Sequence, residues 1–406
     1  MSVQNSSLAE DNGTSAAAGP NGALASWSAV FALSLCVFTL IASEFMPVSL
    51  LTPIAGELRI TEGEVGQAIA VSGAFAVLTS LVIASVTGPL DRKNLLLILT
   101  GLMLLSGIVV AAAPTYPILM LGRAMIGIVI GGFWSMSAAT AMRLVPEDQV
   151  PRALAILNGG NALATVIAAP LGSFLGGIIG WRGAFLCVVP VAAVVLVWQA
   201  VSLPAMKVQT SGGSGQVFRL LRRPVVALGM AAMSLFFMGQ FALFTYLRPF
   251  LETVTGVDLT TLSLLLLLIG AAGFIGTLLI ERFVRQGLYG TLVAIPVLMA
   301  LIAAGLIGFG ASLLATALLL AGWGLLATSA PVGWWTWLAR TLPHESEAGG
   351  GLMVATVQLA ITIGATVGGL LFDASGYTAT FGAATVLLAL AALLTLLTGR
   401  RAVPPV

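Results

Sequence analysis

Long apolar stretches run almost without interruption from Trp27 to Thr398, broken only by short polar segments. A helix needs about 20 mainly apolar residues to cross a bilayer, and these stretches reach that length repeatedly. Only 8% of the 406 residues are charged, against roughly 25% in an ordinary soluble domain. A water-soluble fold is excluded, and the lipid bilayer is the expected surrounding of the chain.

Glycine, proline and charged clusters mark loops and divide the chain into twelve predicted membrane-spanning helices. The first six are expected at residues 27–51, 64–87, 94–113, 115–142, 153–178 and 183–203. The second six are expected at residues 224–250, 260–283, 288–310, 312–338, 348–371 and 377–398. The predicted fold class is an all-α polytopic membrane protein.

The polar segments outside these helices predict the domain organisation and the orientation. Residues 1–26, rich in Ser, Ala, Gly and Asn, and residues 399–406 are expected to be tails, with the first disordered. Residues 204–223 contain a Ser/Gly stretch and are expected to link a bundle at 27–203 to a bundle at 224–398. Thirteen basic residues would lie on the side of the termini and three on the other side. This bias predicts that both termini are cytoplasmic, in a bacterial inner membrane.

A single offset of 196 residues relates the two halves of the sequence. Gly172, Gly180-Trp181 and Phe185 match Gly368, Gly376-Tyr377 and Phe381. Under the same offset Glu44 matches Gln240. The pattern predicts two parallel six-helix pseudo-repeats, with a substrate site between them near the middle of the membrane.

Two ionisable side chains, Glu44 and Arg123, lie deep within predicted helices. Both are expected roughly 10–12 Å below the same membrane surface, from the helical rise of 1.5 Å per residue. At matching depth they could pair, directly or through water, and the proton affinity of such a carboxyl would respond to its surroundings. Glu44 and Arg123 are therefore candidates for proton coupling. The alternative is a permanent Glu–Arg brace between helices.

Small residues and a proline occur at helical spacing in two predicted helices. Arg123, Gly127 and Gly131 share one face of the helix at 115–142. Pro170 precedes Gly172 and Gly176 in the helix at 153–178. A kinked, glycine-faced helix can rock against its partners, although close membrane packing explains such glycines equally well.

Polar and aromatic residues inside helices are candidates for solute recognition. The candidates for lining a substrate cavity are Trp134, Asn158, Asn161, Gln240, Phe241 and Gln358. Amides with aromatic faces suit a flat, neutral, hydrogen-bonding solute such as a nucleobase, and they also suit a sugar or an amphipathic drug. Trp334, Trp335 and Trp337 are expected to form an interfacial belt at the end of the helix at 312–338.

Other functions find little support in the residues. Cys36 and Cys187 both lie in apolar runs, without ligand spacing, and predict neither metal nor redox chemistry. A nucleophile with a neighbouring base is absent from the pattern, so an enzyme is not expected. The net charge of +2 is too small to indicate nucleic acid. We expect no cofactor apart from the proton, and a monomer, because two repeats already enclose a pathway.

These motifs resemble the major facilitator superfamily, in its drug:proton antiporter branch. The resemblance rests on Arg123-x3-Gly127-x3-Gly131-Gly132, on Ala169-Pro170-Leu-Gly172 to Gly176, and on Pro47-Val48 to Pro53. It implies that Arg123 takes part in proton coupling and that the proline and glycines serve export. Asp91-Arg92-Lys93 occupies the place of the family's gate loop. The resemblance implies that Asp91 and Arg92 act in gating, with Asp91 facing the helix start at Gly349–Gly351.

Four further stretches resemble the members of this branch that export purine ribonucleosides. They are Glu44-Phe-Met-Pro47-Val-Ser-Leu-Leu-Thr-Pro53, Gly131-Gly-Phe-Trp134-Ser-Met-Ser137, Thr245-Tyr246-Leu-Arg248-Pro249 and Pro331-Val-Gly333-Trp334. This likeness implies proton-driven export of inosine- and guanosine-type nucleosides by alternating access. Sugar exporters share Glu44-Phe-x-Pro47-Val48, so sugar or drug efflux stays an alternative. A membrane receptor that binds without transporting is the alternative from another class.

Overall fold

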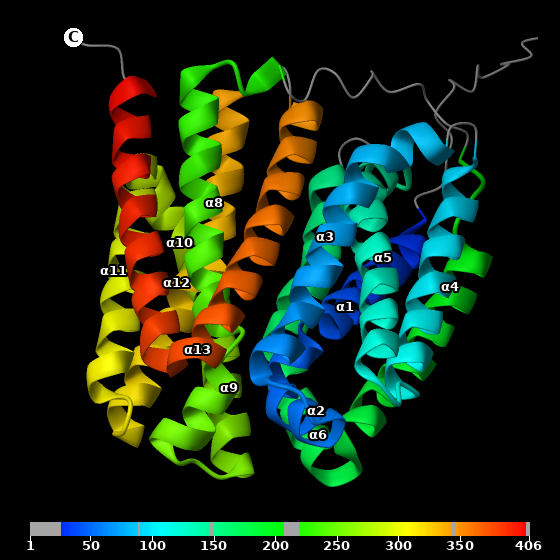
Figure 1. The fold of residues 1–406 in the computed structure, drawn as a ribbon. Coiled ribbons are helices and arrows are strands. Elements are labelled where there is room, and N and C mark those ends of the chain that lie inside the picture. Colours follow the sequence, from blue (N-terminus) through cyan, green and yellow to red (C-terminus); the bar gives the residue numbers. More distant parts are fainter. Residues whose placement is uncertain (1–25, 88–89, 147–148, 207–218, 343–345, 403–406) are drawn as a thin grey trace, which may run out of the picture.

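The structure is a computed structural model that describes residues 26–87, 90–146, 149–206, 219–342 and 346–402. Within these ranges every regular element is a helix, and the helices form two bundles that stand side by side (Figure 1). Most of the predicted N-terminal tail and of the linker lies outside the described residues. The predicted all-α membrane fold is confirmed.

The first bundle contains the helices that precede the linker. They are α1 (Trp27–Ser49), α2 (Leu51–Leu58), α3 (Glu62–Thr87), α4 (Arg92–Ala111), α5 (Tyr116–Arg143) and α6 (Val150–Ser202). The second bundle contains α8 (Pro224–Phe244), α9 (Leu247–Phe250), a π-helix (Leu251–Thr255), α10 (Leu259–Gln286), α11 (Leu288–Phe309), α12 (Leu313–Thr341) and α13 (Ser346–Ala402).

Two of these helices cross the membrane twice. Within the described ranges ten helices are long and apolar enough to span a bilayer, and the spans of α6 and α13 cover 51 and 53 residues. Each doubled helix breaks at one glycine with a left-handed backbone, Gly180 at φ +74° and Gly376 at φ +73°. Glycine adopts this conformation without the steric cost that a side chain brings. The ten helices thus contain twelve crossing segments, as predicted.

The two breaks are equivalent positions of the repeat. Gly180 and Gly376 are 196 residues apart. After the first, Trp181 and Phe185 pack edge to face with ring centroids 6.4 Å apart. After the second, Tyr377 and Phe381 do the same at 5.9 Å. The repeat predicted from the sequence is therefore present in the packing as well.

Several helix ends differ from the prediction. The first predicted helix ends at Ser49, two residues early, and Leu51–Leu58 forms the separate helix α2. The seventh stops at Phe244, and the chain continues in α9 and the π-helix. The last helix runs on to Ala402, because arginines in a final turn are compatible with the partial negative charge at a helix C-terminus.

The prediction of an interfacial tryptophan belt near the end of α12 was wrong for two of its three residues. Trp334 and Trp337 are buried in the second bundle, where their rings pack edge to face. They lie three residues apart and so share one face of the helix. Trp335, on the other face, is exposed.

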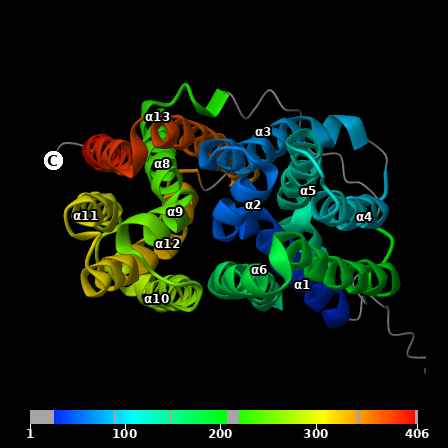
Figure 2. The same ribbon diagram turned by 60° about the horizontal axis from the view of Figure 1, so that its bottom comes forward.

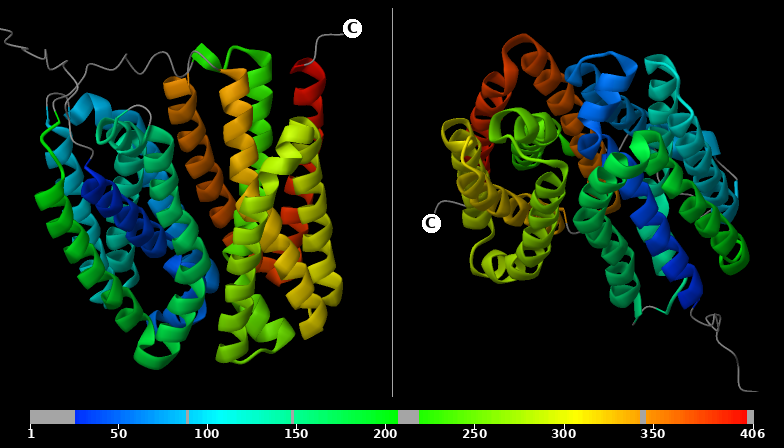
Figure 3. Two further views of the ribbon diagram at one scale, coloured as in Figure 1. Left: turned by 180° about the vertical axis from the view of Figure 1, so that it is seen from behind. Right: turned by 90° about the horizontal axis from the view of Figure 1, so that it is seen from below.

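Two pairs of helices make the most extensive contacts between the bundles. Within the bundles α1 packs on α6 and α8 packs on α13, while α3 meets α13 and α6 meets α10 across the boundary (Figure 2). We call the end with Leu203, Pro224 and Ala402 the linker end, and the end with Gly180 and Gly376 the far end. The ribbons of the bundles approach each other at the far end and spread apart toward the linker end, which is also visible from behind (Figure 3).

Candidate functional site

Arg123 is buried in the first bundle and binds main-chain carbonyls of two neighbouring helices. Only 1% of the residue is exposed. Its guanidinium donates to the carbonyls of Ser43 at 2.7 Å, Glu44 at 2.8 Å and Ala68 at 3.1 Å. A further bond reaches the Ser72 hydroxyl at 3.2 Å. The planar guanidinium thus holds α1, α3 and α5 together, which a flexible ammonium group could not do with the same geometry.

Glu44 is 2% exposed and lies beside Arg123 without forming an ion pair with it. The arginine bonds to the Glu44 backbone carbonyl, so the direct form of the predicted pairing is not present. The charges of the two groups still interact, and the side chain of Gln358 lies close enough to the Glu44 carboxyl to donate a hydrogen bond to it. Gln358 belongs to α13, so this contact crosses the boundary between the bundles.

The residue after Glu44 belongs to an aromatic pair that joins the two bundles. The rings of Phe45 and Phe241 stack across the boundary, with centroids 5.6 Å apart and planes inclined by 26°. Gln240, next in the chain, has a buried side-chain oxygen without a hydrogen-bond partner among the described residues, and the side-chain oxygen of Gln358 shares this property. Two stacked rings and two buried amide oxygens without a described partner thus lie on helices that face the boundary between the bundles.

The other predicted cavity residues make local contacts. Asn158 is exposed and its amide nitrogen donates to the Leu154 carbonyl at 2.9 Å. Asn161 is half-buried on the same helix. Trp134 is half-buried and packs edge to face on Phe133. The structure thus places Gln358 at the Glu44 carboxyl and Phe241 against the neighbouring Phe45. Trp134, Asn158 and Asn161 have no described contact with Glu44.

The predicted glycines lie where backbones come closest. A Cβ atom on Gly127 would meet the Ser72 carbonyl, and one on Gly131 would meet the Ala76 carbonyl, so these glycines let α5 contact α3. A Cβ atom on Gly172 would lie 2.7 Å from the Ser49 hydroxyl. Gly176 faces Leu50 in the same way, and Pro170 lies within α6 without a break in the helix. All of these contacts are internal to the first bundle.

Asp91 caps its own helix. Its carboxylate accepts a bond from the Lys93 backbone nitrogen at 2.8 Å at the start of α4. The Arg92 backbone nitrogen donates to the Met206 carbonyl at 3.0 Å. The expected contact of Asp91 with Gly349–Gly351 is absent from the described residues, because the bundles stand apart at the linker end.

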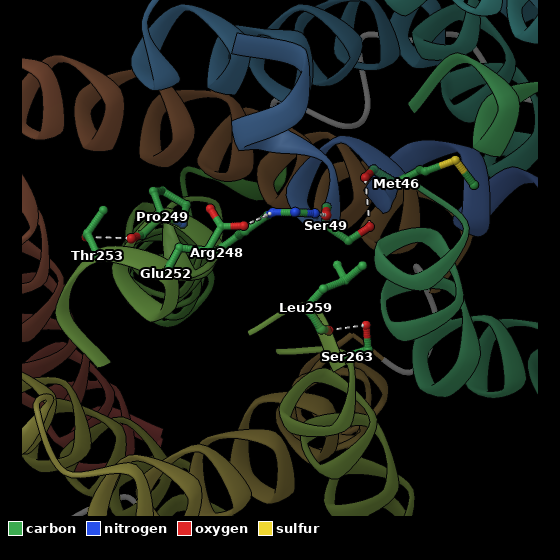
Figure 4. Close-up of polar contacts among 8 residues, drawn as sticks. All are labelled: Met46, Ser49, Arg248, Pro249, Glu252, Thr253, Leu259 and Ser263. Carbon is green, nitrogen blue, oxygen red and sulfur yellow. Dashed lines mark hydrogen bonds and ion pairs between the residues drawn. The ribbon is translucent and has the colours of Figure 1, made fainter. Parts of the chain in front are cut away.

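Arg248 joins the bundles near the far end, as Figure 4 shows. It lies between the Glu252 carboxylate, 2.8 Å from its Nε atom, and the Ser49 carbonyl of the other bundle, to which it also donates. The side chain is buried. The sequence analysis named Arg248 within the stretch Thr245 to Pro249 that resembles nucleoside exporters, and it gave no sign of this contact with the other bundle.

Asp373 makes the second connection at the far end. It accepts bonds from the Thr61 hydroxyl at 2.6 Å and from the Gly63 backbone nitrogen at 3.0 Å. Closer to the centre, Thr366 donates to Gln67 at 3.1 Å. The hydrogen bonds just described, together with that from Thr362 to the Ala70 carbonyl, join the bundles between the far end and the centre. The structure is therefore closed at the far end.

Twelve crossing segments in two repeats, with a buried carboxyl and aromatic and amide groups at their boundary, define a multi-pass membrane transporter. A family model described as the Major Facilitator Superfamily matches residues 33–359. The chain belongs to this superfamily, whose members are transporters and not enzymes.

Two relatives in sequence and one solved structure are similar to the chain. It is 64% identical to a Pseudomonas aeruginosa protein named transcription regulatory protein OpdE, over 93% of this chain and 95% of that protein. It is 41% identical to the purine ribonucleoside efflux pump NepI of Salmonella typhimurium, over 92% of each chain. The crystal structure of a D-xylose–proton symporter has the same fold, with a TM-score of 0.73 at 17% identity, covering 91% of this chain and 96% of that one.

Proposed function

We propose that this protein is a proton-coupled antiporter that exports purine ribonucleosides such as inosine or guanosine. The observation that carries the proposal is the buried Glu44 carboxyl, which faces the side chain of Gln358 across the bundle boundary. A proton on Glu44 would change a contact that joins the two bundles. Proton binding and the movement of the bundles are then linked through one group.

The groups beside Glu44 support a flat solute with hydrogen-bonding edges. The stacked rings of Phe45 and Phe241 offer aromatic surface, and the free amide oxygens of Gln240 and Gln358 can accept hydrogen bonds from a base or from ribose hydroxyls. The likeness to the efflux pump NepI at 41% identity supports the same class of solute. Trp134, Asn158 and Asn161 stay candidates for the wider pathway.

We place the linker end in the cytoplasm, from the distribution of basic residues. The far-end contacts of Arg248 and Asp373 support the proposal that this state is open toward the cytoplasm. Export would require these contacts to break. Gly127, Gly131, Pro170, Gly172 and Gly176 would let the first bundle adjust as it moves, and Asp91 and Arg92 would act at the opposite gate.

The test is transport of radiolabelled inosine in proteoliposomes with an imposed pH gradient. Wild type should move inosine against its concentration gradient, and Glu44→Gln should lose this driven transport while keeping inosine exchange at zero gradient. Glu281→Gln is the matched control, because Glu281 is exposed and pairs only with Arg285 in its own helix. Driven transport by Glu44→Gln at the wild-type rate would disprove the coupling role. Absence of inosine movement in wild type, with arabinose or chloramphenicol moved instead, would overturn the substrate class.

A regulatory receptor is the second candidate function, since a relative at 64% identity is named a transcription regulatory protein. The chain covers 95% of that relative, so the relative consists almost wholly of the same membrane fold. Any regulation would therefore act through solute binding or transport in the membrane. A receptor would bind inosine in proteoliposomes and move none of it, with or without a pH gradient.

A further inference from the structure

A groove of about 560 Å³ opens on the outer surface of the second bundle, away from the proposed pathway. It runs between the start of α11 and the end of α13, which lie side by side at the linker end (Figure 1). Its main lining residues are Tyr289, Gly290, Val297, Leu396, Gly399 and Arg400.

Two glycines shape this groove. A Cβ atom on Gly290 would meet nothing within 4 Å, so this position faces open space. A Cβ atom on Gly399 would lie 3.0 Å from the Tyr289 ring, so the ring rests against the backbone of α13. The absence of both side chains leaves a channel between the first turn of α11 and the last turns of α13.

The inner part of the groove is apolar and faces the bilayer. Val297 is 40% exposed and Leu396 is 41% exposed, and both belong to the apolar outer surface of the bundle. From Tyr289 to Val297 the groove follows α11 for about 12 Å, at 1.5 Å per residue. Lipid chains surround such a surface in a membrane, so an acyl chain is its natural occupant.

The outer end of the groove is positively charged. Arg400 is exposed in the last turn of α13 and is followed by Arg401. Neither arginine forms an ion pair with another described residue, and the groove has no acidic lining residue. An arginine at the level where membrane helices end is well placed for a lipid phosphate, which its planar guanidinium can bind through two hydrogen bonds.

We propose that this groove binds one anionic phospholipid, with its phosphate at Arg400 and an acyl chain along α11 between Gly290 and Val297. A zwitterionic lipid would fill the apolar part equally well, but it would leave the paired charges of Arg400 and Arg401 without net compensation. The site therefore selects by headgroup charge. It is independent of the proposed transport function, since it involves neither Glu44 nor Gln358.

The experiment is native mass spectrometry of the full chain in detergent, titrated with phosphatidylglycerol or with phosphatidylcholine. For the first lipid molecule that binds, wild type should have a several-fold higher affinity for phosphatidylglycerol than for phosphatidylcholine. Arg400→Gln should weaken phosphatidylglycerol binding about fivefold, because a basic residue near a membrane surface contributes about 1 kcal/mol. Arg340→Gln is the matched control, an exposed arginine in the last turn of α12 that does not line the groove.

A second variant tests the apolar part of the site. Gly290→Leu should fill the groove and weaken both lipids, while the charge of Arg400 is unchanged. Equal binding of the two lipids by wild type, or equal loss in Arg400→Gln and Arg340→Gln, would overturn the proposal. A dimer that forms through this face in place of lipid binding would overturn it as well.

Discussion

Phe45 and Phe241 stack ring on ring at 5.6 Å across the boundary between the bundles, and they are equivalent positions of the repeat, 196 residues apart. Equivalent residues can touch only where the approximate twofold axis passes between them. The stack therefore marks the centre of the molecule. Glu44 precedes one ring and Gln240 precedes the other, so the repeat places an acid on one side of the axis and an amide on the other.

This asymmetry suits a coupled transporter. The two bundles share one backbone arrangement. Different side chains at equivalent positions beside the axis can therefore give the two halves different chemistry without a change in the fold. Glu44 can hold a proton, while Gln240 can only exchange hydrogen bonds. Under the proposed function, one half supplies the coupling group and the other half contributes to recognition.

The first prediction concerns closure at the far end. Asp373→Asn should weaken the bonds from Thr61 and Gly63, because hydrogen bonds to a charged acceptor are roughly twice as strong as neutral ones. If the closed state lost about 1 kcal/mol of stability, the fraction of molecules that are open at the far end would rise about fivefold. The measurement is the labelling rate of a cysteine at Ala70, buried where α3 meets α13, with Cys36 and Cys187 replaced by alanine.

Asp258→Asn is the control for this measurement. Asp258 also lies at the far end, but it caps α10 through Thr261 and joins no other helix bundle. A membrane-impermeant maleimide applied from the far end should label the Asp373 variant faster than the Asp258 variant. The closure role of Asp373 fails if the two variants and the parent react at the same rate.

The second prediction compares two glycines in neighbouring helices. Gly127→Ala places a Cβ atom against the Ser72 carbonyl and 2.8 Å from the Phe75 Cβ atom, and such overpacking typically costs about 1–3 kcal/mol. Gly101→Ala meets nothing within 4 Å and should stabilise α4 by about 0.5–1 kcal/mol, since glycine is a poor helix former. Thermal unfolding in detergent should move the midpoints in opposite directions. A rise for Gly127→Ala would show that α5 does not need this close approach to α3.

Part of this arrangement was predictable from single residues. Glu44 and Arg123 stood out because a charge deep in an apolar run is costly and rare. Gly180 and Gly376 stood out because each follows one long run and precedes another at a fixed offset, so a reversal of the chain had to occur there. The lengths of the apolar runs and the polarity of single residues are enough for these predictions.

The contacts of these residues were not predictable in the same way. Arg123 binds backbone carbonyls, and a carbonyl is present at every position, so residue identity gives no sign of which ones are used. The joining contacts of Arg248 and Asp373 depend on how two separately folded bundles come together. Residue spacing within one helix holds no information on that arrangement.

The last prediction separates the charge of Arg123 from its shape. Arg123→Lys keeps a positive charge beside Glu44, but an ammonium group cannot reproduce the bonds to Ser43, Ala68 and Ser72 from one planar group. Each bond to a charged donor contributes about 1.5–3 kcal/mol, so the loss of even one should lower pH-driven transport at least tenfold. Thermal unfolding in detergent would show a lower midpoint in the same variant. Driven transport and an unfolding midpoint equal to those of wild type would mean that charge alone suffices, and that the link from Arg123 to α1 and α3 is not needed for coupling.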